Sequence, residues 1–167
     1  AFGTMDPFDA ISDSLDRAIL LRRQFFDPAV TNAYRIVNSE GDSLPGLIVD
    51  WYAQRAVIQI STLGMEQLKS KIVELLRQKL QPKWIYEKST SPSRKEEGMT
   101  DQDGAVWDDG NLSDERSLHS PTLQKPLSSV GMTKRVVMTD VARNDSPIVI
   151  LENGVKFFVD IVGGQKT

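Results

Sequence analysis

An Asn-Gly pair near the end of the chain is the feature that most constrains its fold. Asn153-Gly154 stands between two runs of strand-forming residues, 148–152 and 155–161. An Asn-Gly connection favours a type I′ turn, because both central residues of that turn need a positive φ. The sequence therefore predicts an antiparallel hairpin. Alternate residues of its second strand, beginning with Val155, are expected to share one face.

Two amphipathic helices are predicted upstream of this hairpin. Asp6-Pro7 is typical of a helix start, with Asp as the N-cap and Pro at the first helical position. Apolar residues then recur at helical spacing from Phe8 to Phe26, and Asp27-Pro28 ends the pattern. A second pattern of this kind runs from Met65 to Leu80 and ends before Pro82.

Short runs typical of strands lie around these helices, at 34–37, 47–52, 56–61, 84–86 and 135–138. The second and third runs are separated by only three residues and predict another hairpin. The order of elements indicates an α+β fold. We expect a mixed, largely antiparallel sheet with two amphipathic helices, ending in the hairpin around Asn153-Gly154.

The segment 99–133 differs from the rest of the chain. It is rich in Asp, Ser, Gly, Thr and Pro, and it cannot bury enough apolar surface to offset the entropy of ordering it. We predict a disordered insertion, with an Ω-like functional loop as the alternative, and we expect the fold to tolerate deletion of residues 100–132. The segment is also acidic. Since the net charge of the whole chain is −3, the remainder is close to neutral, which permits contact with RNA.

The composition excludes several kinds of active site. The chain has no cysteine, which excludes disulfides, zinc–thiolate sites and thiol nucleophiles within it. Its one histidine, His119, falls in the predicted insertion, so catalysis by histidine is not expected. Gly163-Gly164 is too short for a dinucleotide-binding loop, and no phosphate-binding motif is present. No apolar run approaches the roughly 20 residues of a membrane span. We expect neither a metal nor a membrane partner.

Two clusters are candidates for function. One is the run from Arg35 to Tyr52, which places a Gly- and Pro-rich loop between strands. The other is Ser93–Gly98, in which Arg94 and Lys95 could meet phosphates. For both clusters, a purely structural turn is the alternative interpretation.

The first cluster also carries a family resemblance. Residues Ser39–Tyr52, with the sequence Ser-Glu-Gly-Asp-Ser-Leu-Pro-Gly-Leu-Ile-Val-Asp-Trp-Tyr, resemble the signature of bacterial class I methyltransferases of large-subunit rRNA. The resemblance covers most of residues 8–98 and 134–167. Three further elements resemble the family in the same order: Asp16-Arg17-Ala18 with Arg22-Arg23, Arg94 with Glu97-Gly98, and Glu152–Phe157 continuing to Gly164–Thr167.

Members of this family make 5-methylcytosine in 23S rRNA and have PUA, central and methyltransferase domains. The resemblance implies that the chain is the central, substrate-side domain of an S-adenosylmethionine (SAM)-dependent rRNA methyltransferase. It would be inactive alone, because the Rossmann-like domain that binds SAM and carries the nucleophilic cysteine would follow Thr167. The implied partners are rRNA and that catalytic domain, in the cytoplasm, and a homodimer is left open.

This resemblance sets the expected organisation. Residues 1–7 would be a tag or a remnant of a preceding domain, and 8–98 the central α+β domain. Residues 99–133 would be the insertion, and 134–167 the hairpin that completes the domain. Two alternatives stay open: a free-standing RNA-binding or interaction module without catalysis, and a related methyltransferase with another RNA target.

The resemblance and the charge pattern together give candidate site residues. Those expected at the edge of the cofactor cleft are Gln165, Lys166 and Thr167. Those expected to contact RNA phosphates are Arg35, Arg94, Lys95 and Lys166.

Overall fold

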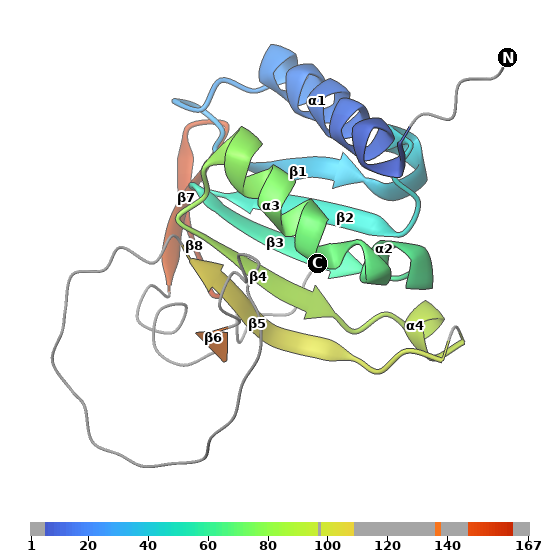
Figure 1. Cartoon of the computed structure of the whole chain (residues 1–167). Helices are drawn as coiled ribbons and strands as arrows, with labels where there is room; N and C mark the ends of the chain where they lie inside the picture. The colour runs from blue at the N-terminus through green and yellow to red at the C-terminus, as the bar shows by residue number, and fades with distance from the viewer. Residues whose placement is uncertain (1–5, 97, 109–135, 138–146, 162–167) are drawn as a thin grey trace, which may run out of the picture.

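The computed structural model of the chain describes residues 6–96, 98–108, 136–137 and 147–161 (Figure 1). The helices are α1 (Pro7–Phe25), the 3-10 helix η1 (Ser39–Asp42), α2 (Leu63–Gln67), α3 (Lys69–Leu80) and α4 (Pro92–Glu96). The strands are β1 (Ala33–Asn38), β2 (Leu47–Tyr52), β3 (Arg55–Ile60), β4 (Trp84–Ser89), β5 (Gln102–Asp108), β6 (Val136–Val137), β7 (Ile148–Glu152) and β8 (Val155–Val159).

The first six strands form one sheet in the order β1-β2-β3-β4-β5-β6. Every neighbouring pair is antiparallel except β3 and β4, which are parallel. A parallel pair needs a crossover connection, and α2 and α3 provide it. The predicted α+β fold with a mostly antiparallel sheet is confirmed. Figure 1 shows α1 and α3 side by side over the same face of this sheet.

Helix α1 forms where the sequence predicts it. The Asp6 carboxylate accepts a hydrogen bond from the Phe8 N–H at 2.9 Å, and Pro7 occupies the first helical position. Its apolar stripe is buried against the sheet. The second predicted helix is divided at Leu68, whose ψ of 2° interrupts the helix between α2 and α3.

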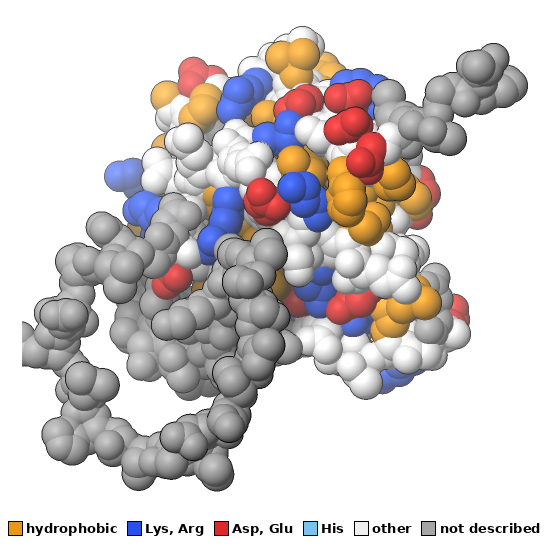
Figure 2. All heavy atoms as spheres, viewed as in Figure 1, with side chains coloured by type: hydrophobic (Ala, Val, Ile, Leu, Met, Phe, Trp, Pro, Cys, Tyr) orange, Lys and Arg blue, Asp and Glu red, His pale blue; other side chains and the backbone are white. Residues whose placement is uncertain are grey.

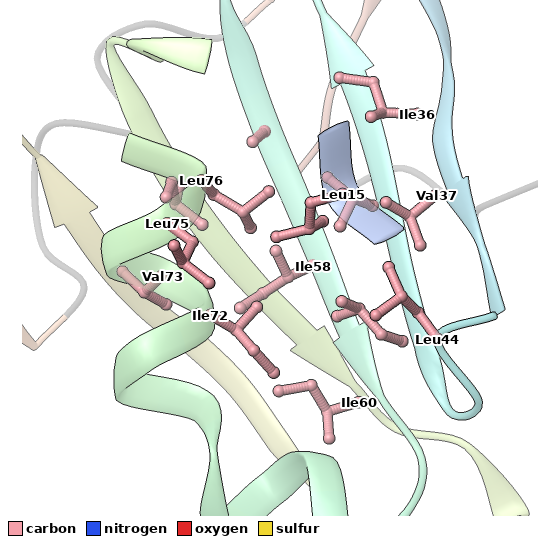
Figure 3. Packing of buried hydrophobic residues seen from close by; sticks show 14 of the residues in the cluster. Leu15, Ile36, Val37, Leu44, Ile58, Ile60, Ile72, Val73, Leu75 and Leu76 are labelled. Carbon is pink, nitrogen blue, oxygen red and sulfur yellow. The ribbon is translucent and has the colours of Figure 1, made fainter. Parts of the chain in front are cut away.

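The main core lies between the helices and the sheet. Figure 3 shows Leu15 of α1, Ile58 of β3 and Ile72 of α3 converging there. All three side chains have no exposed surface. Burying a large aliphatic side chain contributes about 1.5–3 kcal/mol, so this layer holds α1 and α3 in place over the sheet.

The opposite face of the sheet is covered by the hairpin β7–β8. Because strand residues alternate between faces, Val57 and Tyr86 point away from the helices and form a second core with Ile148 and Ile150 of β7. The hairpin turn has φ values of 51° at Asn153 and 79° at Gly154, the left-handed conformations that this pair favours. The hairpin therefore forms a separate two-stranded sheet that joins the domain by packing and by hydrogen bonds from Leu151 and Asn153 to the segment before β1.

Strand β5 corrects the prediction for the segment after Met99. Residues 102–108 were expected to be irregular, but they pair with β4 and β6, and Val106 and Trp107 are buried. The apolar trio Ala105–Trp107 is short and flanked by Asp and Gly, so the composition of the segment does not predict a strand. The structure argues against the expected tolerance to deletion of residues 100–132, because this deletion would remove β5. Residues 109–133 lie outside the described residues.

Candidate functional site

The loop whose sequence resembles the family signature is joined to helix α1 by an arginine–carboxylate pair. Arg22 donates two hydrogen bonds to the two carboxylate oxygens of Asp42, both at 2.7 Å. Asp42 Oδ2 also accepts from the Asn38 N–H at 2.6 Å. The exposed fractions of the Arg22 and Asp42 side chains are only 15% and 7%. A bidentate pair of this kind fixes geometry as well as adding energy, so Asp42 positions the loop.

A second pair joins the two strands on either side of this loop. Arg35 of β1 and Asp50 of β2 are cross-strand partners, and Arg35 Nε donates to Asp50 Oδ1 at 2.8 Å. The hydrogen bond to Asp50 raises the pKa of the Arg35 guanidinium. Asp50 is buried, whereas 42% of the Arg35 side chain stays exposed. Arg35 can therefore still meet an external anion, although a buried carboxylate balances its charge.

A pocket of about 340 Å³ opens beside the Arg22–Asp42 pair, between the end of α1, the start of β1 and the end of α3. Its volume lies at the lower end of the roughly 300–1,000 Å³ that small-molecule pockets span. Tyr34 and Trp51 are cross-strand partners on its floor, and Phe26 stacks on Tyr34 with ring centroids 4.6 Å apart. The walls are thus largely aromatic and aliphatic.

Polar groups stand around this apolar lining. Arg23, Asn32 and Gln54 line the pocket, each from a different segment. Burial raises the pKa of the Tyr34 hydroxyl, and the positive charge of Arg23 acts in the opposite direction. The charge of Arg22 is balanced by Asp42, while Arg23 makes no ion pair with any residue of the described chain. The pocket therefore combines aromatic rings with one uncompensated positive charge.

The burial of Arg94 contradicts the predicted contact of this residue with RNA phosphates. Only 1% of its side chain is exposed, and it donates to the carbonyl of Ile60 at 2.6 Å, the carbonyl of Thr100 at 2.8 Å and the carboxylate of Glu66 at 3.0 Å. A buried guanidinium with all these acceptors cannot reach an external phosphate. Arg94 instead ties the end of β3 to α2 and to the segment before β5.

Arg94 belongs to a larger buried charge network. Lys69 contacts the carboxylates of Glu66 at 2.5 Å and Glu87 at 2.8 Å, and the Ser89 hydroxyl donates to Glu87 at 2.9 Å. Among the described residues, no buried side-chain nitrogen or oxygen lacks a hydrogen-bond partner. Burial acts to raise the pKa of the Glu66 carboxyl, but hydrogen bonds from Lys69 and Arg94 outweigh it and hold that pKa below its usual value. The network therefore has a structural role within the fold.

The other predicted site residues are not brought together. Lys95 lies on α4, and 73% of its side chain is exposed, 3.8 Å from Asp101. Arg35 lies on β1, three strands away from β4, which α4 follows. Gln165, Lys166 and Thr167 lie outside the described residues.

The pocket was missed by sequence reasoning. The basic pair Arg22-Arg23 is visible in the sequence at the end of α1. No local sequence pattern shows that Tyr34 and Trp51 become neighbours. Figure 2 shows basic and acidic side chains interspersed on the helix-bearing face, without one continuous basic stripe.

The described part of the chain has neither a membrane-spanning helix nor a metal-binding cluster. None of its helices is both long and apolar enough to cross a membrane. Within residues 6–96, 98–108, 136–137 and 147–161, no group of three or more acidic or histidine side chains could hold a metal ion.

Comparison with known structures shows the fold. A structure described as "a putative SAM-dependent methyltransferase from Streptococcus mutans" matches 93% of this chain and 30% of its own, with a TM-score of 0.55 and 17% identity. A second, described as "a putative methyltransferase complexed with SAH", matches 97% of this chain and 32% of its own, with a TM-score of 0.58 and 20% identity. The chain therefore has the fold of one part of these larger proteins.

Comparison with curated proteins gives closer relatives, although no protein-family model matches the chain. Proteins named ribosomal RNA large subunit methyltransferase I from Alteromonas mediterranea and Vibrio cholerae are 31% and 33% identical to it over 153 residues. The same-named protein of Shewanella denitrificans is 30% identical over 159 residues. These matches cover 92–95% of the chain but only 30–32% of each relative. The chain is thus similar, over nearly its whole length, to about 30% of the length of rRNA large-subunit methyltransferases.

Proposed function

We propose that this chain is the RNA-facing, non-catalytic part of a SAM-dependent methyltransferase that acts on 23S rRNA in the cytoplasm. The observation that carries the proposal is the 31% identity spanning 92% of the chain to a protein named as an rRNA methyltransferase. The sequence contributes a second argument. It has neither a cysteine nor a glycine-rich nucleotide loop, so neither the nucleophile nor the SAM site of such an enzyme lies in it.

The role left to this chain is to hold RNA. Nucleic-acid affinity comes largely from cations that meet phosphates. Arg23 lines the pocket, and the half-exposed Arg35 of β1 is a second candidate cation outside it. Arg23 and the aromatic pocket together provide the mixture of charge and stacking surface that single-stranded RNA needs. Lys95 and Lys166 remain further candidates for phosphate contact.

SAM would be bound elsewhere in the enzyme, with Gln165, Lys166 and Thr167 at the edge of that cleft. The catalytic part would form 5-methylcytosine. The outward face of the hairpin offers a surface against which that part could pack. Val149 and Phe158 are cross-strand partners there, and their side chains are 45% and 75% exposed. An exposed aromatic–aliphatic pair is typical of a surface that is covered in a larger assembly.

Two titrations of the chain test this proposal. The anisotropy of labelled 23S rRNA fragments is expected to rise on binding, with an affinity that falls as salt increases. Calorimetry with SAM is expected to show no binding. Measurable SAM affinity would place the cofactor site in this chain, and absence of RNA binding at low salt would contradict the RNA-facing role.

A matched pair of variants tests which cation carries the RNA affinity. Arg23 and Arg17 both lie on α1 and both are exposed, but only Arg23 lines the pocket. Arg23→Ala should reduce the salt dependence of RNA binding by about one phosphate contact, whereas Arg17→Ala should leave it unchanged. Equal effects of the two variants would show that affinity follows net charge rather than this surface.

A further inference from the structure

The geometry points to a nucleobase-binding site: the pocket between α1, β1 and α3 holds one unpaired base of single-stranded RNA against Tyr34 and Trp51. This inference rests on the proposed function and names the part of RNA that the pocket takes. The alternative ligand, the backbone of an RNA duplex, is recognised through phosphates and sugar hydroxyls along a surface and needs no aromatic pocket.

The aromatic floor supplies the stacking surface. Tyr34 and Trp51 face the same side because they are directly opposite in the β1–β2 register. Phe26 stacks on Tyr34 with an interplanar angle of 10°, which fixes the orientation of the Tyr34 ring. A fixed ring loses little conformational freedom when a base stacks on it, which favours binding.

The polar groups suit the edge of a base and its phosphate. Asn32 is held by its backbone and by its side-chain oxygen. Its N–H donates to the Leu151 carbonyl at 2.9 Å, and its Oδ1 accepts from the Leu151 N–H at 2.8 Å. Its side-chain amide donors are not used in these bonds and can serve a base edge, as can the exposed amide of Gln54. Arg23 is the group for the adjoining phosphate.

The other cavity-lining charge cannot play that part. Arg22 lines the same pocket, but both of its terminal nitrogens are bound to Asp42 and its Nε donates to the Arg35 carbonyl at 3.2 Å. Its charge and donors are therefore committed within the protein. Among the described residues that line the pocket, the site thus offers one cation without an ion pair, two amides and an aromatic floor, a set that matches one nucleotide of a single strand.

Fluorine NMR of the whole chain tests the inference directly. The chain has three tryptophans, and Trp84 and Trp107 are only 2% and 8% exposed. With 5-fluorotryptophan incorporated and the Trp51 signal assigned from Trp51→Phe, short single-stranded oligoribonucleotides should shift the Trp51 signal and leave the other two in place. A blunt RNA duplex of the same sequence should leave all three in place.

The ligand is identified by comparing probes. Mononucleotides should bind more weakly than oligoribonucleotides, because they lack the neighbouring phosphates of a strand. Equal affinity for a mononucleotide would overturn the assignment to an RNA strand. If RNA binds by anisotropy while the Trp51 signal stays in place, the base site is wrong and the proposed function stands. If no RNA binds at all, both fail.

Variants provide a second readout. Tyr34→Ala should weaken binding of single-stranded RNA by between about fivefold and a hundredfold, while Tyr34→Phe, which keeps the ring, should bind close to wild type. The Phe variant and the unaltered chain keep the test meaningful if the Ala variant folds poorly. Equal affinities for folded Ala and Phe variants would contradict a stacking role for Tyr34.

Discussion

Arg22 and Asp42, twenty residues apart in the chain, are joined by two parallel hydrogen bonds of 2.7 Å. This pair holds the last turns of α1 against η1, and Arg22 also lines the pocket beside it. Asp42 belongs to the run that resembles the family signature, and in this structure it positions the loop.

The first prediction concerns this pair. Arg22→Lys keeps the charge but cannot form the bidentate fork, so it should lower the free energy of unfolding by about 1–3 kcal/mol. Urea denaturation measures the change. Lys71→Ala is the control, because Lys71 and Glu74 form an exposed pair that should contribute less than about 1 kcal/mol. Wild-type stability in Arg22→Lys would show that the fork has no structural role.

The second prediction separates two adjacent cations. Arg94→Ala leaves buried carbonyls and Glu66 without their partner and should cost about 3–5 kcal/mol of stability. Lys95→Ala removes an exposed side chain and should change stability by less than about 0.5 kcal/mol. Thermal melting of both variants measures the difference, and similar midpoints would contradict the buried network.

The third prediction uses three glycines. Gly64 lies in α2 with open space at its Cβ position, so Gly64→Ala should stabilise the fold by about 0.5 kcal/mol. Gly154 has equal space but a φ of 79°, so its Ala variant should cost about 1–2 kcal/mol. Gly46 combines a φ of 82° with a Cβ position 2.4 Å from Thr62 Oγ1, and its variant should be the least stable. Any other order of unfolding midpoints would contradict these backbone conformations.

The fourth prediction concerns acid stability. Bonds from Lys69 and Arg94 hold the native pKa of Glu66 below its usual value of 4.5. A lowered native pKa contributes stability that is present above the unfolded value and is lost as pH falls through the native one. Glu66→Gln should therefore be less stable than wild type at neutral pH, and the gap should narrow below about pH 4.5. A gap that stays constant down to acid unfolding would argue against this ion pair.

Local patterns predicted most of the fold. The N-cap and proline defined α1, and Asn153-Gly154 defined the last hairpin, because each of these signals acts over a few neighbouring residues. Strand β5 was missed because its burial depends on β4 and on the core behind Trp107. The residues that flank this strand in the sequence are acidic and do not predict a strand.

The candidate site was less predictable for the same physical reason. Arg94 and Lys95 are equivalent as charges in the sequence, yet one is buried against the Ile60 carbonyl, 34 residues away, and the other is exposed. The pocket needs the β1–β2 register to bring Tyr34 to Trp51. That register depends on a bulge between Arg35 and Val37. No local sequence pattern predicts this bulge.

Ultraviolet crosslinking of the chain to 23S rRNA, followed by mass spectrometry of the crosslinked peptides, tests the central claim most directly. We predict crosslinks on peptides that contain Phe26, Tyr34 or Trp51, because these aromatic residues line the pocket that Arg23 also lines. Their yield should fall in Arg23→Ala and stay unchanged in Arg17→Ala. Crosslinks confined to peptides of α4 or of the β7–β8 hairpin would contradict the account.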